Sequence, residues 1–256
     1  MRFKGIIAPM LAVISWPLPA ATLYLSGSVG TAPVFVTVER SGETIDGWYL
    51  YLKQGRQIRL VGKVDAKGAL TLTEKDASTD KATGTFEGAI AGERWSGTWQ
   101  KPGGTATIPF SITENHDALA DASGHFRCTA KKTDSEFHYT YRHSLDLTLR
   151  HGEVGALSLD RTATSTDGDE QACHLGKDDL ERAASTSGLL LTTGDEKPHC
   201  TVRVLRAGDY LYVATGDANE DGNDCRMLED TAFCSPRAFW TDLIVNTKTN
   251  ACRSVE

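Results

Sequence analysis

The chain has 256 residues, of which 27 are Lys or Arg, 34 are Asp or Glu and six are Cys, and its formal net charge is −7. This acidic balance argues against nucleic acid or an anionic lipid surface as the partner, because both reward a basic face. It is compatible with a cationic protein partner, although net charge also has the general role of keeping exported proteins soluble.

The first twenty residues have the pattern of a secretory signal peptide. Arg2 and Lys4 form a short basic start, residues 5–16 are mostly apolar, and residues 17–21 are small and turn-prone. The apolar stretch is shorter than the roughly 20 residues that a membrane-spanning helix needs. We therefore expect residues 1–20 to be cleaved on export to the periplasm. Without Arg2 and Lys4, 25 of the 27 basic residues remain against 34 acidic ones, about −9.

All the cysteines lie in the second half of the chain, and their even number in an oxidising compartment predicts three disulfides. Their pairing stays open, because six cysteines allow about 15 connectivities. A zinc site is disfavoured, since no C-x2-C pair is present. The disulfide candidates are Cys128, Cys173, Cys200, Cys225, Cys234 and Cys252.

The first half of the chain is predicted to be a series of short antiparallel strands. Apolar and polar residues alternate, and turn residues recur every 8–12 positions or so, as in a small barrel or sandwich. Val36 and Val38 alternate with Thr37 and Glu39, so one face of that strand should be buried. The expected strands are residues 23–29, 34–39, 45–52, 57–64, 69–74, 83–89, 94–99 and 106–112.

The second half is also predicted to be mainly β. A polar, turn-rich stretch separates it from the first half, so we expect a β domain over 21–114, a linker over 115–124 and a cysteine-containing β domain over 125–256. Residues 178–184 could form a short helix, with acid at the front and Gly188 behind. The expected strands are 125–128, 137–149, 154–159, 189–191, 200–205, 210–213 and 239–245. The fold class is thus all-β, with two mainly antiparallel domains, the second stapled by disulfides.

The residues after the expected strand 210–213 begin like a calcium-binding loop. Oxygen-bearing side chains at alternate positions converge on a hard cation, and a glycine permits the sharp turn that presents the next carbonyl. Residues 217–222 read D-A-N-E-D-G and match the start of the calcium pattern. The candidate calcium ligands are therefore Asp217, Asn219, Asp221 and Asn223.

The end of this loop departs from the calcium pattern. Leu228 stands where an EF-hand places its bidentate glutamate, and Glu229 comes one residue late. A shorter calcium loop would need an acid where the chain has Cys225, and Asp224 comes one residue early. An acidic surface turn before a disulfide accounts for the same residues, so both interpretations stay open.

Motifs for catalysis are not evident in the sequence. It contains no G-x-S-x-G or H-E-x-x-H motif and no phosphate-binding glycine loop. On one extended strand, Asp134, Glu136 and His138 would share one face, and Tyr139, Tyr141 and His143 the other. A solvated strand face explains such sets more simply than a metal or acid–base centre. A carboxylate pair of the kind that glycosidases use is neither excluded nor indicated. We therefore expect a binding protein and not an enzyme.

The first domain resembles that of secreted inhibitors of peptidoglycan hydrolases, particularly immunity proteins against effectors of the bacteria-killing type IV secretion system. The matching segments span about 75 residues: 27–34 (GSVGTAPV), 47–51 (GWYLY), 58–62 (IRLVG), 70–74 (LTLTE) and 96–99 (SGTW). The resemblance implies occlusion of a hydrolase cleft in the periplasm and an acidic calcium loop at 217–221. The chain departs from the family in its six-cysteine second half, in having no cysteine at the cleavage point and in its loop end.

These observations predict a periplasmic inhibitor whose partner is a cationic peptidoglycan hydrolase, either a lysozyme-like enzyme or a secreted antibacterial effector. The expected partner-binding residues are Asp224, Arg226, Glu229, Asp230 and Phe233. The alternative is an envelope- or carbohydrate-binding module without catalytic activity. Such a module would use exposed aromatic side chains, for which the candidates are Trp48, Tyr49, Tyr51, Trp95 and Trp99.

Overall fold

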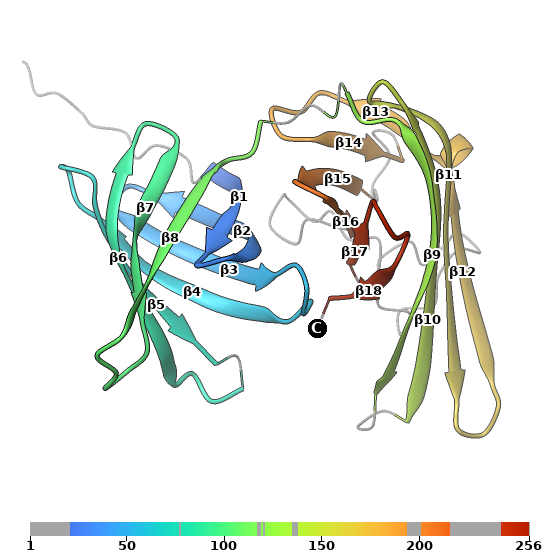
Figure 1. Cartoon of the computed structure of the whole chain (residues 1–256). Helices are drawn as coiled ribbons and strands as arrows, with labels where there is room; N and C mark the ends of the chain where they lie inside the picture. Colours follow the sequence, from blue (N-terminus) through green and yellow to red (C-terminus); the bar gives the residue numbers. More distant parts are fainter. Residues whose placement is uncertain are drawn as a thin grey trace, which may run out of the picture.

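The computed structural model describes residues 21–76, 78–116, 119, 121–134, 138–193, 201–215 and 242–255. The prediction of an all-β chain is confirmed, because these residues form antiparallel strands and a single short 3-10 helix. Figure 1 shows the three bodies: a closed barrel, a six-stranded sheet in the middle and a four-stranded sheet on the far side. No helix within these residues has the length and apolarity that crossing a bilayer requires.

The first half settles the choice between barrel and sandwich in favour of a closed barrel. Each strand pairs with the next along the chain, and the first pairs with the last, so no sheet edge is left open. The strands are β1 (Ala21–Val29), β2 (Ala32–Ser41), β3 (Thr44–Tyr51), β4 (Gln57–Val64), β5 (Ala69–Lys75), β6 (Ala82–Ala91), β7 (Arg94–Gln100) and β8 (Thr107–Glu114).

Side chains fill the barrel interior. The alternation along β2 places Val34, Val36 and Val38 in this core, where they meet Trp95 and Tyr49. An eight-stranded barrel is about wide enough for its own side chains, so large aromatic groups from several strands complete the packing. The barrel is therefore a packed structural body.

The carboxylate of Glu74 is buried in the barrel and accepts hydrogen bonds from three side chains. Its Oε2 accepts hydrogen bonds from Tyr49 Oη at 2.8 Å and from Trp99 Nε1 at 2.7 Å, and its Oε1 accepts one from Thr83 Oγ1 at 2.8 Å. Burial and the nearby carboxylate raise the pKa of Tyr49, so the phenol keeps its proton and donates it. At Gly84 a Cβ atom would lie 2.2 Å from Trp99 Nε1, which explains the glycine.

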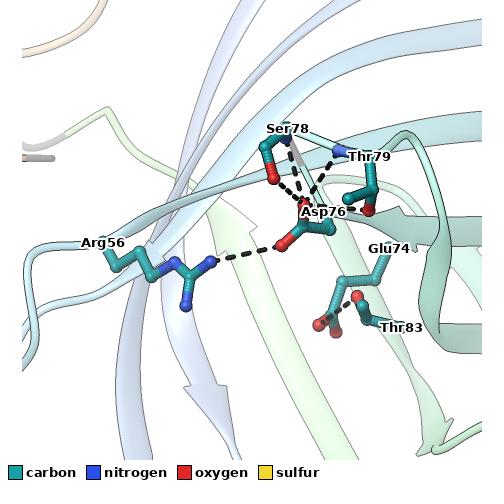
Figure 2. A network of polar contacts seen from close by, with 6 residues as sticks. All are labelled: Arg56, Glu74, Asp76, Ser78, Thr79 and Thr83. Carbon is teal, nitrogen blue, oxygen red and sulfur yellow. Dashed lines mark hydrogen bonds and ion pairs between the residues drawn. The ribbon is translucent and has the colours of Figure 1, made fainter. Parts of the chain in front are cut away.

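A second carboxylate, Asp76, closes the loop after β5 (Figure 2). Its Oδ1 accepts hydrogen bonds from the backbone and side chains of Ser78 and Thr79, and its Oδ2 pairs with Arg56 at 3.3 Å. These hydrogen bonds lower the pKa of Asp76 to about 2. The loop is thus tied by a carboxylate that stays ionised at neutral pH.

The second half forms two packed sheets. The four-stranded sheet has the order β12-β11-β10-β9, and the six-stranded sheet runs from β13 to β18 in sequence order. The first contains β9 (Gly124–Asp134), β10 (Tyr139–Arg150), β11 (Glu153–Ser165) and β12 (Glu170–Gly176). The second contains β13 (Glu181–Ala183), β14 (Leu189–Thr192), β15 (Thr201–Ala207), β16 (Tyr210–Thr215), β17 (Leu243–Asn246) and β18 (Cys252–Ser254).

A shared apolar core and a disulfide hold these two sheets together. Leu147 and Leu159 of the four-stranded sheet pack in the same cluster as Val204 of the six-stranded sheet. Cys128 on β9 bonds to Cys252 on β18, with 5.7 Å between their Cα atoms. The bridge spans a sequence separation of 124 residues, and a loop of that size adds about 4–5 kcal/mol in the chain-entropy description.

The helix predicted over 178–184 is wrong. Only η1 (Lys177–Asp179) is helical, and β13 follows it and pairs with β14. A helix of seven residues gains too few hydrogen bonds to offset its nucleation cost, whereas the strand completes a sheet edge. Strands β12 and β18 were also not among the strands expected from the sequence.

The six-stranded sheet is covered on its other face by the barrel. Phe35 and Leu50 on the outside of the barrel form one buried cluster with Leu205 and Tyr212 of the sheet. Asn115, directly after β8, donates from Nδ2 to the carbonyl of Arg206 at 2.7 Å. The barrel and the sheet therefore share an apolar interface.

The Glu74 network should contribute strongly to stability. Replacing Glu74→Ala leaves the buried Tyr49 and Trp99 donors without their acceptor and should cost about 2–4 kcal/mol in the free energy of unfolding. Chemical denaturation measures this. Glu87→Ala, on an exposed position of β6, is the matched control and should change the value by less than about 0.5 kcal/mol. Equal losses in both variants would contradict the role given to the network.

Candidate binding site

The site predicted from the sequence begins and ends on two neighbouring strands. β16 ends at Thr215, β17 begins at Leu243, and the two strands pair antiparallel with Val213 opposite Leu243. Residues 216–241 therefore leave and return at one place on the six-stranded sheet. The expected calcium ligands and partner-binding residues lie outside the described residues: Asp217, Asn219, Asp221, Asn223, Asp224, Arg226, Glu229, Asp230 and Phe233.

Asp242 ties together the two ends of this connection. Its Oδ1 accepts a hydrogen bond from the backbone N–H of Thr215 at 3.0 Å, and its Oδ2 accepts one from the hydroxyl of Tyr212. A single carboxylate thus joins the last residue of β16 to the residue before β17. We call Asp242, Thr215 and Tyr212 the root of the connection.

Aromatic packing against the barrel holds the root on one side. The ring of Tyr212 stacks on Phe35 with 4.7 Å between centroids, and the centroid of Trp48 lies 5.9 Å away. Tyr212 is only 1% exposed. This packing places the hydroxyl of Tyr212 beside Asp242, so the root is anchored on the interface with the barrel.

The four-stranded sheet holds a buried pair of basic side chains, one of which, His143, lines a small cavity together with Thr215 of the root. His143 on β10 is directly opposite Arg161 on β11, and they are 3% and 2% exposed. The guanidinium carbon of Arg161 lies 4.6 Å from the ring centroid of Tyr141. The predicted grouping of Tyr141 and His143 on one strand face is therefore seen, with Tyr139 stacked beside Tyr141.

Burial sets the charges of this pair. Desolvation, together with the positive charges of Arg161 and Lys132, lowers the pKa of His143 to about 3. Desolvation also lowers the pKa of Arg161 to about 10. At neutral pH the imidazole is consequently neutral and the guanidinium is charged.

Arg161 was not among the residues expected to be functional, although the residue pattern of β11 indicates that its side chain is buried. Leu157, Leu159, Arg161 and Ala163 alternate along the strand, and all four are buried. A charged residue at an inward position of such a pattern indicates a buried charge. In the other predicted trio, Glu136 lies outside the described residues, as does the side chain of Asp134.

Of the six cysteines, two are placed by the structure, as the Cys128–Cys252 bridge. The side chains of the other four lie outside the described part of the chain: Cys173, Cys200, Cys225 and Cys234. Among the described residues, no group of three or more His, Cys, Asp or Glu side chains could hold a metal ion. The calcium expected at 217–223 falls outside them.

The expectation that five aromatic residues are exposed for carbohydrate binding is wrong. Tyr49 and Trp95 are buried in the barrel, and Tyr51 and Trp99 pack against its core. Trp48 packs in the interface between the barrel and the sheet. Closure of the barrel turns alternate positions of each strand inward. Trp48 faces outward, and the six-stranded sheet partly covers it.

A cleft lies where the barrel meets the second half of the chain. It has a volume of about 420 Å³, and both polar and apolar side chains line it, among them Thr22, Tyr24, Thr186, Ser187 and Arg203. Its size falls within the range of small-molecule sites in proteins.

Arg203 forms part of the wall of this cleft and is itself well bound. Its Nη1 donates to Ser185 Oγ at 2.8 Å and to the carbonyl of Ser187 at 3.0 Å, and its guanidinium carbon lies 4.5 Å from the ring centroid of Tyr24. The cleft therefore presents hydroxyl groups beside a positively charged wall.

Comparison with models of protein families, with curated proteins and with solved structures identifies no match to this chain.

His143 should make the stability of the protein depend on pH. Its pKa is lower in the folded state, so its contribution is present at neutral pH and is lost as the pH falls toward about 3, by up to about 1.4 kcal/mol per pH unit. His143→Gln should remove this part of the loss. Denaturant unfolding between about pH 7 and about pH 4 measures it, with His151→Gln at an exposed position as control. Parallel curves for wild type and His143→Gln would refute the assignment.

Proposed function

We propose that this protein is an exported, periplasmic inhibitor of a peptidoglycan hydrolase and acts by placing residues 216–241 in the cleft of that enzyme. The observation that carries the proposal is the root: a long connection whose two ends are joined by Asp242 and supported by packing on both faces of the sheet. Binding residues are commonly found on loops that a rigid scaffold positions. A connection of this length is usually functional or a linker.

The charge of the connection favours a cationic partner. Residues 216–241 contain six acidic side chains and two arginines, which is a larger imbalance than in the chain as a whole. Complementary charge steers association and selects the partner more than it raises affinity. A cationic hydrolase of the lysozyme type has the surface that such a segment would bind.

Two further features of the connection would lower the entropy cost of binding. Calcium held by Asp217, Asn219, Asp221 and Asn223 would order its first part, and disulfides at Cys225 and Cys234 would restrict the rest. Ordering a segment before association improves affinity because less freedom is lost in the complex. Calcium is therefore proposed as a structural ligand, and the protein as a binder without catalytic activity.

The first experiment is a pull-down with the mature, oxidised protein from periplasmic and secreted extracts, with calcium and with a chelator. Recovery of a peptidoglycan hydrolase whose activity falls on binding supports the proposal. Loss of that binding with the chelator places the calcium loop in or beneath the interface. Recovery of no hydrolase under either condition argues against inhibition.

Charge reversal tests the proposed contact directly. The triple variant Asp221→Lys, Glu229→Lys and Asp230→Lys should weaken binding to the captured hydrolase at least about 100-fold, since each close charge pair contributes about 1.5 kcal/mol or more. Inhibition assays on cell-wall material measure it.

A matched triple variant carries the same charge change elsewhere. Its substitutions lie at exposed positions of the described chain: Glu43→Lys, Glu87→Lys and Asp178→Lys. This control should bind nearly as well as wild type. Equal loss in both triple variants would indicate a general charge effect and would refute the assigned surface.

The cleft beside Arg203 favours a second candidate function, an envelope-binding module that holds a carbohydrate. Hydroxyl-bearing side chains and an aromatic ring beside a positive charge suit a hydroxylated ligand with an acidic group. The exposed Thr186 faces this cleft and can be enlarged without disturbing a buried core.

Thr186→Trp should lower retention of the protein on purified peptidoglycan several-fold if the cleft binds the polymer. A co-sedimentation assay measures the retained fraction, with the exposed Thr129→Val on β9 as control. Unchanged retention of the tryptophan variant would exclude the cleft as the binding site, and absence of any retention by wild type would exclude this function.

A further inference from the structure

Another cavity lies between the four-stranded and the six-stranded sheet, and we call it the sandwich pocket. Its volume is about 220 Å³. Leu190 of β14 lines the cleft beside Arg203, whereas Leu189 and Leu191 line the sandwich pocket, because successive side chains of a strand point to opposite faces. The pocket therefore lies on the core side of β14, next to the edge strand β13, at the upper end of the two sheets in Figure 1.

The floor of the sandwich pocket is apolar and continues into the core between the sheets. Leu189 and Leu191 are buried members of that core, and Val154 and Leu180, which also line the pocket, pack against it. An apolar cavity of about 150 Å³ is large enough to bind benzene. The sandwich pocket is larger than that, so it can hold a single ring or a short aliphatic chain together with a small polar group.

The charged side chains that line the pocket have an excess of positive charge. They are two cations, Lys177 and Arg182, and one carboxylate, Glu153. Arg182 Nη1 pairs with Glu153 Oε1, which links the edge strand β13 to the start of β11. The ammonium group of Lys177 has no ion pair within the described part of the chain. This balance favours an anion in a chain whose net charge is −7.

Local structure places each cation beside an apolar side chain of the pocket. Side chains three residues apart lie on the same face of a 3-10 helix, and Lys177 and Leu180 have this spacing at η1. The backbone N–H of Leu180 donates to the carbonyl of Lys177 at 3.1 Å and closes this turn. Arg182 on β13 is directly opposite Leu191 on β14, and directly opposite residues share a face of the sheet. The pocket thus combines an apolar floor with cationic groups at fixed places on its wall.

We propose that the sandwich pocket binds a small anionic amphiphile, a carboxylate attached to a short aliphatic chain or a single ring. The apolar part lies against Leu180, Leu189 and Leu191, and the carboxylate accepts hydrogen bonds from Lys177 and Arg182. The apolar floor alone would accept any small hydrophobic molecule, and the excess of cations selects an anion. This inference does not depend on the proposed function, because the pocket contains no residue of the connection 216–241.

The test is a titration of the mature, oxidised protein with octanoate, followed by methyl NMR and by calorimetry. Octanoate has about ten non-hydrogen atoms, and a Kd of about 1 mM or lower is expected for a ligand of this size. The methyl signals of Leu180, Leu189 and Leu191 should shift, whereas those of Leu60 and Leu72 in the barrel should not.

Two comparisons separate the apolar part of the ligand from its charge. Hexanoate lacks two methylene groups and should bind about 15-fold more weakly, because each buried methylene contributes about fourfold in affinity. Octanol keeps the chain but has no charge, and it should bind at least about fivefold more weakly than octanoate.

Variants at exposed positions test the charged wall without disturbing the core. Lys177→Gln should weaken octanoate binding several-fold and leave octanol binding unchanged. Glu153→Gln should strengthen octanoate binding several-fold, because it removes the carboxylate that competes for Arg182. Lys101→Gln removes an exposed lysine of the barrel and is the matched control, with the affinity of wild type expected for both ligands.

Three results would overturn the proposal. The first is a wild type in which the leucine methyl signals of the pocket do not shift with octanoate, whether or not other signals do. The second is octanol bound as tightly as octanoate, which would mean that the pocket does not select an anion. The third is an octanoate affinity that is the same in Lys177→Gln, Glu153→Gln and Lys101→Gln. None of these measurements involves a hydrolase, so a failure here is distinguishable from a failure of the inhibitor proposal.

Discussion

Strands β15 and β16 are covered on both faces, by the barrel on one side and by the four-stranded sheet on the other. Val202 and Val204 of β15 face the sandwich core, whereas Leu205 and Ala207 face the barrel. Apolar burial contributes about 25 cal/mol per Å² of surface removed from water. A sheet that buries both faces therefore ties the two halves of the chain into one packed arrangement.

This packing surrounds the two ends of the connection formed by residues 216–241. Residues 216–241 join two inner strands that pair with each other, β16 and β17, so both ends of the connection start from packed strands. Asp242 joins the two ends there, and Tyr212 links that carboxylate to the aromatic interface with the barrel. The barrel, whose interior is filled by its own side chains, then acts as a support for the sheet.

Three buried charged side chains differ in the partners that surround them. Glu74 is bound by a phenol, an indole and a hydroxyl, and Arg203 by a hydroxyl, a carbonyl and a tyrosine ring. Arg161 also has a tyrosine ring, but its Nε and Nη1 have no acceptor among the described residues. All three side chains are buried. The sites therefore differ in the hydrogen-bond partners that they provide and not in how deeply the charged group is buried.

The sequence by itself determined the all-β class and most strands, because alternation with period two and regular turn residues are local properties. It also indicated Tyr141 and His143 as neighbours, since residues two apart on a strand share a face. Barrel closure, the pairing of Cys128 with Cys252 and the docking of Phe35 on Tyr212 join residues far apart in the chain. Only the tertiary structure decided those contacts, and with them the burial of Tyr49 and Trp95, the partial burial of Trp48 and the burial of Arg161 against Tyr141. Whether a position faces solvent, a core or a second sheet depends on what packs against it, which local pattern does not encode.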